Sequence, residues 1–328
     1  MLDQHNATLT SRLSELPEDQ LARLMQASAF PHVLRMLAEG FVTLYEASPR
    51  VSSLFASQQR WLLCHAALAH HFRAMFDGTT GLTRRGLGLM AVELGLASRN
   101  TAYAFFDEAL KYGIIRPSMR GDGCRVGEVE LSSEPTTALI HWYDLHFKAL
   151  DLIDGAGRSD RFLAQPERAL AILAPRFAPA LLSSTQVRMP GPFYTIFTWA
   201  DAGGNLMDRL IAGIENHALP KDGCFPTDVM SISQLAESFA LSRSHTSRKL
   251  AAAEALGGIG WSGRRGYSSM WISTDFYKEY ARAQAQKLFL LDNAFAEVMP
   301  VHSAKGSPSP RPLSARETTE TRLRSRQR

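Results

Sequence analysis

The sequence predicts a mainly α-helical fold in which one arrangement, a helix-turn-helix followed by a β-hairpin, occurs twice. The clearer copy occupies residues 231–272, and a second copy begins at residue 86. Apolar residues at three- and four-residue spacing, typical of helices, fill both copies and the long segments around them. We therefore expect two tandem winged helix-turn-helix units whose long flanking helices form a pseudo-two-fold, dimer-like body.

The clearer copy contains start and stop signals for two helices and a hairpin. The helices are expected at 233–239 and 244–256, joined by Ala240-Leu241-Ser242, where Ser242 can cap the second helix. Gly257-Gly258 ends that helix, because glycine tolerates the left-handed conformation of a helix end. Strands are expected at 259–261 and 270–272. The residues expected to face inward from the second helix are Thr246, Leu250, Ala253 and Leu256.

The polar residues of this copy are of the types that contact DNA. The N-terminal part of a recognition helix enters the major groove. The residues expected to be exposed there are Arg243, Ser244, His245, Ser247, Arg248 and Lys249. Arg264 and Arg265 lie at the hairpin tip, where arginine suits a phosphate backbone or a narrow minor groove. The alternative is an ordinary basic helix pair followed by a hairpin.

The two copies align with an offset of 145 residues. With this offset Met90, Ala91, Leu94, Leu96, Thr101, Phe105 and Gly113 fall on Leu235, Ala236, Phe239, Leu241, Thr246, Leu250 and Gly258. The match continues into the flanking helices at offsets of 136 to 141, where Leu34, Leu37, Ala38, Phe41 and Trp61 fall on Leu170, Leu173, Ala174, Phe177 and Trp199, and Leu150-Asp151 on Leu291-Asp292. Matching core positions in two copies indicate an internal repeat.

The repeat predicts the division of the chain. An N-terminal helical extension, 1–30, precedes a first repeat, 31–157, and a second repeat, 158–300. A helix opened by Pro31 and a helix at 53–76, with Phe76 among its buried residues, come before the first helix-turn-helix. Long helices follow the hairpins at 135–153 and 276–298, each after a capping residue. The last segment, 301–328, is rich in proline, serine and arginine, and is expected to be a disordered basic tail.

The element order resembles that of the MarR (multiple antibiotic resistance regulator) family, taken as a tandem version in which two subunits are joined head to tail. The motif carrying the resemblance is LAxxFxLSRSxxSRxL, at Leu235–Leu250. The resemblance covers roughly residues 31–298. It implies interlocking outer helices and two winged helices that reach successive major grooves.

The copies differ in the residues that would contact DNA. The first offers Arg99, Asn100 and Tyr103 on its second helix and Arg120 in a longer wing. A homodimer reads a palindrome because its halves are identical, whereas a fused pseudo-dimer can read two unlike half-sites. We expect the second copy to supply more phosphate affinity, and the first to read a different sequence or to serve in packing.

Charge and composition narrow the classes of protein to which the chain could belong. The formal net charge is +4, but residues 305–328 hold seven basic and two acidic side chains, so residues 1–304 carry −1. A nucleic-acid surface must then be a local patch. No apolar run reaches the ~20 residues of a membrane span, and the N-terminus lacks the apolar core of a signal peptide. The three separated cysteines fit a reducing cytoplasm.

The sequence shows no pattern of a catalytic, metal or cofactor site. His65 and His71 are poorly spaced for chelation, and His141 and His146 likewise. No phosphate loop or nucleophile elbow occurs, so we expect no enzyme activity. The aromatic residues Trp61, Phe72, Trp142, Phe193, Phe197 and Trp199 are expected in the central core. The alternative is that they line a pocket for a small apolar effector.

These observations favour a bacterial, cytoplasmic, sequence-specific DNA-binding transcriptional regulator, associated with the nucleoid when bound to double-stranded DNA. A plasmid-type replication initiator with tandem winged helices is one alternative. A winged-helix protein-interaction module that does not bind DNA is another. A pseudo-dimer has less need of a second chain, so both a monomer and a dimer fit.

Overall fold

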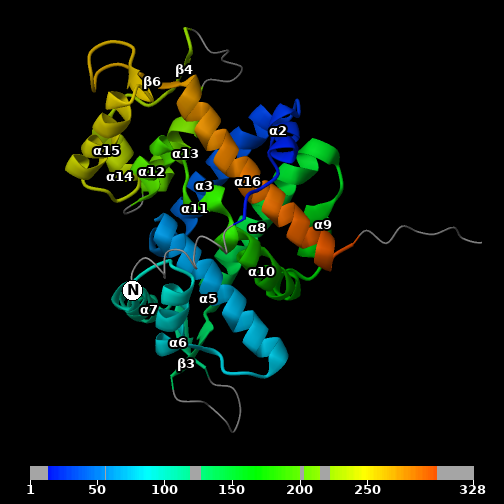
Figure 1. Cartoon of the computed structure of the whole chain (residues 1–328). Coiled ribbons are helices and arrows are strands. Elements are labelled where there is room, and N and C mark those ends of the chain that lie inside the picture. The colour runs from blue at the N-terminus through cyan, green and yellow to red at the C-terminus, as the bar shows by residue number, and fades with distance from the viewer. Residues whose placement is uncertain (1–13, 56, 119–126, 200–202, 215–221, 301–328) are drawn as a thin grey trace, which may run out of the picture.

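The computed structural model describes residues 14–55, 57–118, 127–199, 203–214 and 222–300. Their fold is mainly helical with two small antiparallel sheets (Figure 1). Arg120, Cys124 and the tail 301–328 lie outside the described residues, so the predictions made for them stay predictions. Within the described residues, every helix is either too short or too polar to cross a membrane.

The first half of the chain begins with flanking helices. They are α2 (Glu18–Gln26), α3 (Phe30–Ala47), α4 (Pro49–Leu54) and α5 (Gln58–Asp77). Within the N-terminal helical extension predicted over 1–30, the described residues contain α2, which ends at Gln26. The helix predicted over 53–76 is α5, but it begins only at Gln58, because Ser57 caps it by accepting a hydrogen bond from the Arg60 N–H, which separates α5 from α4. Phe76, expected in the core, is 61% exposed.

A helix–helix–hairpin segment follows, here called the first unit (residues 82–131). It contains β1 (Leu82–Thr83), α6 (Arg84–Glu93), α7 (Arg99–Lys111), β2 (Ile115–Pro117) and β3 (Glu128–Leu131). The strands form an antiparallel sheet in the order β1-β3-β2. The long helix α8 (Ser133–Asp154) leaves the sheet and ends at Gly155, which has a positive φ of 70°.

The second half repeats this succession. Its flanking helices are α9 (Arg158–Leu163), α10 (Pro166–Ser183), α11 (Thr185–Arg188), α12 (Pro192–Thr198) and α13 (Gly204–Ala212). The second unit (residues 224–273) contains β4 (Cys224–Pro226), α14 (Ile232–Ser238), α15 (Arg243–Ala255), β5 (Ile259–Trp261) and β6 (Met270–Ser273), followed by α16 (Thr274–Val298). Its sheet order, β4-β6-β5, is the counterpart of β1-β3-β2. The sequence did not reveal β1 and β4, because strands of two or three residues carry no periodic pattern.

The offset between the units changes within the turn. Leu96 N–H donates to Ala91 O and Leu241 N–H donates to Ala236 O, so the turns align with the predicted offset of 145. The following helices begin after the caps Ser98 and Ser242, which are 144 apart. The first turn thus has one more residue. The predicted pairing of Thr101 with Thr246, Phe105 with Leu250 and Gly113 with Gly258 is therefore wrong by one residue. The prediction that Leu256 faces inward is also wrong, since it is 54% exposed.

The two halves exchange packing partners. Helix α3 of the first half packs against α13 of the second, and α10 of the second half packs against α5 of the first. Each also packs against the long helix of its own half, α3 on α8 and α10 on α16. The first and second units lie at opposite ends of this body, with α16 running diagonally across its centre (Figure 1). The position of each unit is therefore fixed by helices from both halves.

The halves differ most in the helix that precedes the first strand of each unit, β1 or β4. In the first half this is the continuous helix α5, 20 residues long. In the second half it is divided into α12 and α13. The predicted equivalence of Trp61 and Trp199 is wrong for this reason. Trp61 contacts His65 and Trp142, whereas Trp199 follows the end of α12 and is 79% exposed.

The connection between the halves is fixed by Arg158. This buried side chain, 7% exposed, binds Asp151 and Asp154 at the end of α8 and Asp292 of α16. The Arg158–Asp292 contact, Nε to Oδ1, is 2.7 Å. Asp151 and Asp292 are the residues paired by the repeat in the sequence, so one arginine serves both equivalent carboxylates.

The turn of the second unit places an alanine in the left-handed region. Ala240 has φ 51°, while Gly95 at the equivalent position has φ 61°. An alanine in this conformation costs about 1 kcal/mol relative to glycine. Ala240→Gly is expected to raise the free energy of unfolding by about 1 kcal/mol, measured by urea denaturation. Gly95→Ala is the reciprocal control and should lower it. Equal or opposite changes would contradict the assigned turn geometry.

Candidate nucleic-acid interface and central cavity

The second unit presents an N-terminal helix end with exposed arginines. Ser242 caps α15 by accepting a hydrogen bond from His245 N–H at 3.2 Å, as the sequence predicted. Arg243, Ser244 and Arg248 are exposed, while His245 and Ser247 are half-buried. Among the described residues, Arg243 and Arg248 have no ion-pair partner. Their charges are thus free to meet an anionic surface.

The hairpin between β5 and β6 carries the other two predicted arginines. Arg264 is exposed and its guanidinium carbon lies 4.5 Å from the ring centroid of Tyr267, which is itself exposed. Arg265 is exposed and faces Glu254 of α15 at 3.5 Å. At the tip, one arginine therefore stacks on an aromatic ring and the other faces a carboxylate.

In the first unit two of the exposed basic side chains, Arg84 and Arg116, are paired with acids. Arg84 makes a bidentate contact with Asp107 at 2.7 and 2.8 Å and lies over the ring of Tyr103. Tyr103 is half-buried, against Gly88 and Arg84. Arg116 pairs with Glu130 at 2.9 Å. Arg99 and Asn100 are exposed at the start of α7, as expected.

Lys249 is not on the exposed face of α15. It is 8% exposed, and its Nζ donates to Ile196 O at 2.8 Å and to Phe197 O at 3.1 Å. The prediction that Lys249 is exposed is wrong because, at the corrected offset, it occupies the core position of Phe105. The carbonyls it reaches are at the end of α12, where the helix leaves carbonyls without intrahelical donors.

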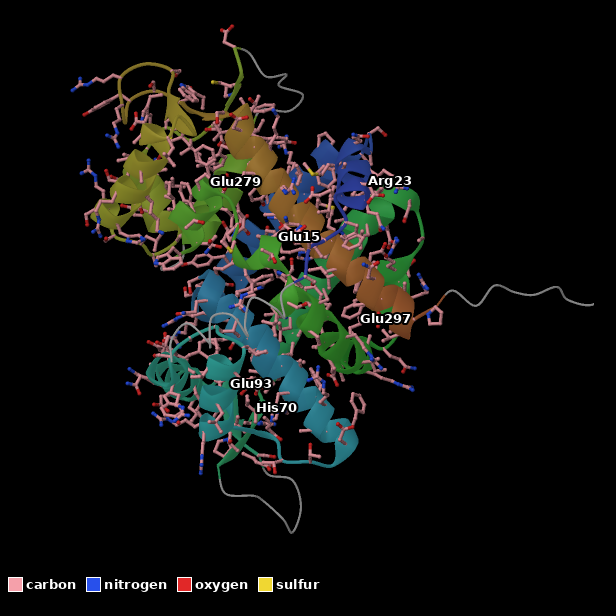
Figure 2. All side chains as sticks on the ribbon, in the orientation of Figure 1. Glu15, Arg23, His70, Glu93, Glu279 and Glu297 are labelled. Carbon is pink, nitrogen blue, oxygen red and sulfur yellow. The ribbon has the colours of Figure 1, made fainter. Side chains whose placement is uncertain are left out.

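Helix α12 is held at both ends by opposite charges. At its N-terminus, Glu279 of α16 accepts a hydrogen bond from Tyr194 N–H at 2.6 Å (Glu279 is labelled in Figure 2). At its C-terminus stands the Lys249 ammonium. Both charges complement the helix dipole. Gly203 is required beside this end, because a Cβ there would clash with Phe197 O and with the Lys249 side chain. These contacts connect α12 to α15 and α16.

Lys249→Met is expected to lower the free energy of unfolding by about 2 kcal/mol, since it leaves the α12 carbonyls unsatisfied while keeping the aliphatic stem. The neighbouring exposed arginine gives a matched control. Arg248→Met should change stability by less than about 0.5 kcal/mol. Urea denaturation of both variants is the measurement. Similar losses in the two variants would show that the buried ammonium has no special structural role.

A cavity of about 190 Å³ lies between the two halves. This central cavity is lined from α3, α5 and α8 of the first half and from α12, α13 and α16 of the second. The residues used below are Phe41, Trp61, His65, Trp142, Tyr194, Asn205, Asp208 and Lys287. The aromatic residues expected in the core are thus divided between packing, cavity wall and, for Trp199, the surface.

Lys287 places an ammonium among aromatic rings in this cavity. Its Nζ lies 5.4 Å from the ring centroid of Phe41, 5.7 Å from that of Trp61 and 6.0 Å from that of Tyr194. Desolvation lowers the pKa of Lys287 to about 8, opposed by the charge of Asp208. Cation–π contacts of this kind offset part of the cost of burying a charge.

Two histidines beside Lys287 are held neutral. Burial, and then the charge of Lys287, lower the pKa of His65 and of His146 to about 3. His146 lies 2.7 Å from Trp142 O through Nδ1, which therefore carries the proton. Among the described residues, no group of three or more His, Cys, Asp or Glu side chains could hold a metal ion.

Asp208 faces the same cavity from α13. The Tyr280 hydroxyl donates to its Oδ1 at 2.7 Å. Desolvation raises the pKa of Asp208 to about 7, against the lowering effects of the Tyr280 bond and of Lys287. Sequence reasoning missed Asp208 and Lys287, which are 79 residues apart. One signal for Lys287 was available, because it continues the inward stripe of Tyr280, Gln284 and Leu291 on α16.

No protein-family model, curated protein or solved structure matches this chain.

The raised pKa of Asp208 makes stability depend on pH. The folded protein retains this proton up to about pH 7, whereas the unfolded chain loses it near pH 3.8. The contribution of this group to the free energy of unfolding of the wild type therefore falls as the pH rises between those values. Asp208→Asn keeps an acceptor for Tyr280 without the charge. Its stability relative to wild type should rise between pH 4 and pH 8, by up to about 4 kcal/mol at about 1.4 kcal/mol per pKa unit.

Chemical denaturation at several pH values measures this difference. Asp275→Asn, at an exposed carboxylate on α16, is the control and should show no such trend. A difference for Asp208→Asn that stays constant with pH would contradict the desolvated state of this carboxyl group.

Proposed function

We propose that the chain is a sequence-specific DNA-binding transcriptional regulator of bacterial type, built from two unlike winged helix-turn-helix units. In this proposal α7 and α15 are the recognition helices, and the β2–β3 and β5–β6 hairpins are the wings. The matching strand orders β1-β3-β2 and β4-β6-β5 support the assignment of two equivalent units. So does the exchange of packing partners between the halves, which resembles an interlocked MarR-type dimer fused into one chain.

The observation that carries the DNA-binding proposal is the exposed, unpaired state of Arg243 and Arg248 on α15. Recognition helices contact base edges with their N-terminal residues, and arginine is the commonest partner of guanine. In this proposal Arg264 on the adjacent hairpin, which is exposed beside Tyr267, contacts the phosphate backbone. Lys249 has no part in this surface, because its ammonium is committed to α12.

The two units are expected to contribute unequally. In the first unit, Asp107 and Glu130 neutralise Arg84 and Arg116, which leaves Arg99 and Asn100 as the exposed candidates on α7. The second unit would then supply most of the counterion release, and the first would add a different base preference. The operator is expected to be an asymmetric pair of half-sites about one helical turn apart.

The pairing of Arg84 and Arg116 with acids also favours a second candidate function, in which the first unit contacts a protein. If neither unit binds DNA, the chain would be a protein-interaction module. A replication initiator would bind DNA as a regulator does, and dependence of origin firing on the protein would distinguish it. Cytoplasmic location and association with the nucleoid follow from the DNA-binding proposal.

The test is a DNA-binding titration after selection from a random duplex pool, with residues 1–304, which exclude the basic tail. Arg243→Ala combined with Arg248→Ala should weaken binding at least tenfold. If both side chains contact phosphate, the slope of log affinity against log salt should fall by about 2, since each lost phosphate contact removes about 1.

Arg99→Ala combined with Asn100→Ala should weaken binding less and relax preference in one half-site only. Arg168→Ala, on the exposed face of α10, controls for a general change in charge. Absence of selected sites and of binding at low salt would exclude both the regulator and the initiator. An equal or larger loss from the α7 substitutions would refute the proposed inequality of the units.

A further inference from the structure

Lys287 places a poorly stabilised amine in the central cavity. Among the described residues that line this cavity, Lys287 is the only lysine or arginine. Its ammonium form has three donor hydrogens, yet among the described residues the only acceptor within hydrogen-bond distance is the Tyr194 hydroxyl, at 3.4 Å. Asp208 lines the same cavity without forming an ion pair with it. A desolvated cation with so few acceptors gives up its proton more readily than an exposed one.

The neutral form of Lys287 is a nucleophile. Desolvation lowers the pKa of Lys287 to about 8, so about one tenth of the side chain is a neutral amine at pH 7. For an ordinary lysine, with a pKa of about 10.4, the neutral share is less than about one thousandth. A lysine desolvated in an apolar pocket is one of the ways in which proteins make an amine that attacks carbonyl compounds.

Asp208 is the matching acid. The Tyr280 hydroxyl donates to its Oδ1 at 2.7 Å, so the proton of the neutral carboxyl group is on Oδ2. Burial raises the pKa of Asp208 to about 7, which keeps the group largely protonated below neutral pH. Asn205 adds an amide donor, since its buried Nδ2 has no hydrogen-bond partner among the described residues. A neutral amine, a protonated acid and a free amide donor in one cavity suit the addition of an amine to a carbonyl group.

The walls and size of the cavity indicate the shape of the carbonyl compound. Phe41, Trp61 and Trp142 provide aromatic surface. The volume, about 190 Å³, exceeds the roughly 150 Å³ of a protein cavity that holds benzene. His65 on the same wall is neutral, because burial lowers its pKa to about 3, so it adds no charge. The space therefore suits a small planar molecule with its reactive group at one end.

We propose that Lys287 captures a small planar aldehyde in the central cavity as a Schiff base, with Asp208 as the proton donor and Asn205 Nδ2 as a hydrogen-bond donor to the aldehyde oxygen. The neutral Nζ attacks the carbonyl carbon, and one proton passes from nitrogen to oxygen to give a carbinolamine. The nitrogen lone pair then expels the hydroxyl group, which leaves as water with the Asp208 proton. The iminium returns its N–H proton to the Asp208 carboxylate. Amine and aldehyde thus give imine and water, with no oxidant or reductant.

The chain has one such site. The repeat places His146 of α8 opposite Lys287 of α16, at the 141-residue offset between these helices. Burial lowers the pKa of His146 to about 3, and an imidazole does not form an imine with an aldehyde. One chain should therefore take up one aldehyde. The proposal is independent of DNA binding.

The experiment is incubation of the full chain with benzaldehyde, followed by quenching of aliquots with borohydride. Borohydride reduces an imine to a stable secondary amine, and peptide mass spectrometry locates the benzylated lysine. Lys287 should be labelled at least tenfold faster than Lys278, an exposed lysine of the same helix, with one fast adduct per chain. Unfolding in urea should abolish this difference. Cyclohexanecarbaldehyde, which is of similar size but not planar, should give a smaller ratio of Lys287 to Lys278 labelling.

The labelling rate of Lys287 should pass through a maximum between pH 7 and pH 8. The reaction requires neutral Lys287 and protonated Asp208, whose pKa values are about 8 and about 7. Asp208→Asn should replace the fall above this maximum with a plateau. Burial keeps the other titratable groups that line the cavity neutral over this range, by raising the pKa of the thiol and phenols and lowering that of the imidazoles. These groups are Cys64, Tyr194, Tyr280, His65 and His146.

Labelling of Lys287 no faster than that of Lys278 in the folded wild type overturns the proposal, and so does a difference that survives unfolding. Neither result needs a variant that folds. A wild-type rate that climbs steadily past pH 10, as for an ordinary lysine, also overturns it. Lys287→Met should abolish the fast adduct and leave Lys278 labelling unchanged. A fast adduct that persists in Lys287→Met would place the reaction at another lysine.

Discussion

The structure depends on the exchange of packing partners between the halves. Helices α3 and α10 occupy equivalent places in the repeat, and each buries its apolar face against a helix of the other half. Leu37 and Leu173, equivalent residues on these helices, are both fully buried. Neither half can keep this core alone, because exposing such a face costs about 25 cal/mol per Å². This exchange sets the distance between the two units and forms the cavity between the two halves.

Within this shared frame, one core position separates the two halves. In the first half the position holds Phe105, which lines a small apolar cavity with Leu68 of the unbroken helix α5. In the second half it holds Lys249, whose ammonium occupies the end of α12. A phenyl ring cannot donate to helix-end carbonyls, so Lys249 stabilises the end of α12 in a way that Phe105 could not. The break between α12 and α13 brings Tyr194, Asn205 and Asp208 to the cavity from two short helices instead of one.

Much of the helical fold was predictable, because the stripes and caps are local. Ser242, the hairpin strands and the long helices after each hairpin follow from neighbouring residues. Lys249 and Lys287 were harder, since a lysine on an apolar stripe is interpreted as exposed unless its distant partner is known. Those partners, Ile196, Phe197 and Tyr194, belong to a helix whose boundaries depend on tertiary contacts. The one-residue change of offset at Ala97 was concealed by the similar apolar residues on either side.

The single arginine between the halves has a consequence for how such a chain selects its partner. Asp151 and Asp292 are equivalent carboxylates, and both bind Arg158, which belongs to the second half. Two copies of the first half placed together in the same way would bring two Asp151 carboxylates toward each other with no cation between them. Like charges left in this position oppose self-pairing. The charges at the junction thus favour pairing of the first half with the second half over pairing with another first half. Because both halves belong to one chain, each first half always has one second half beside it.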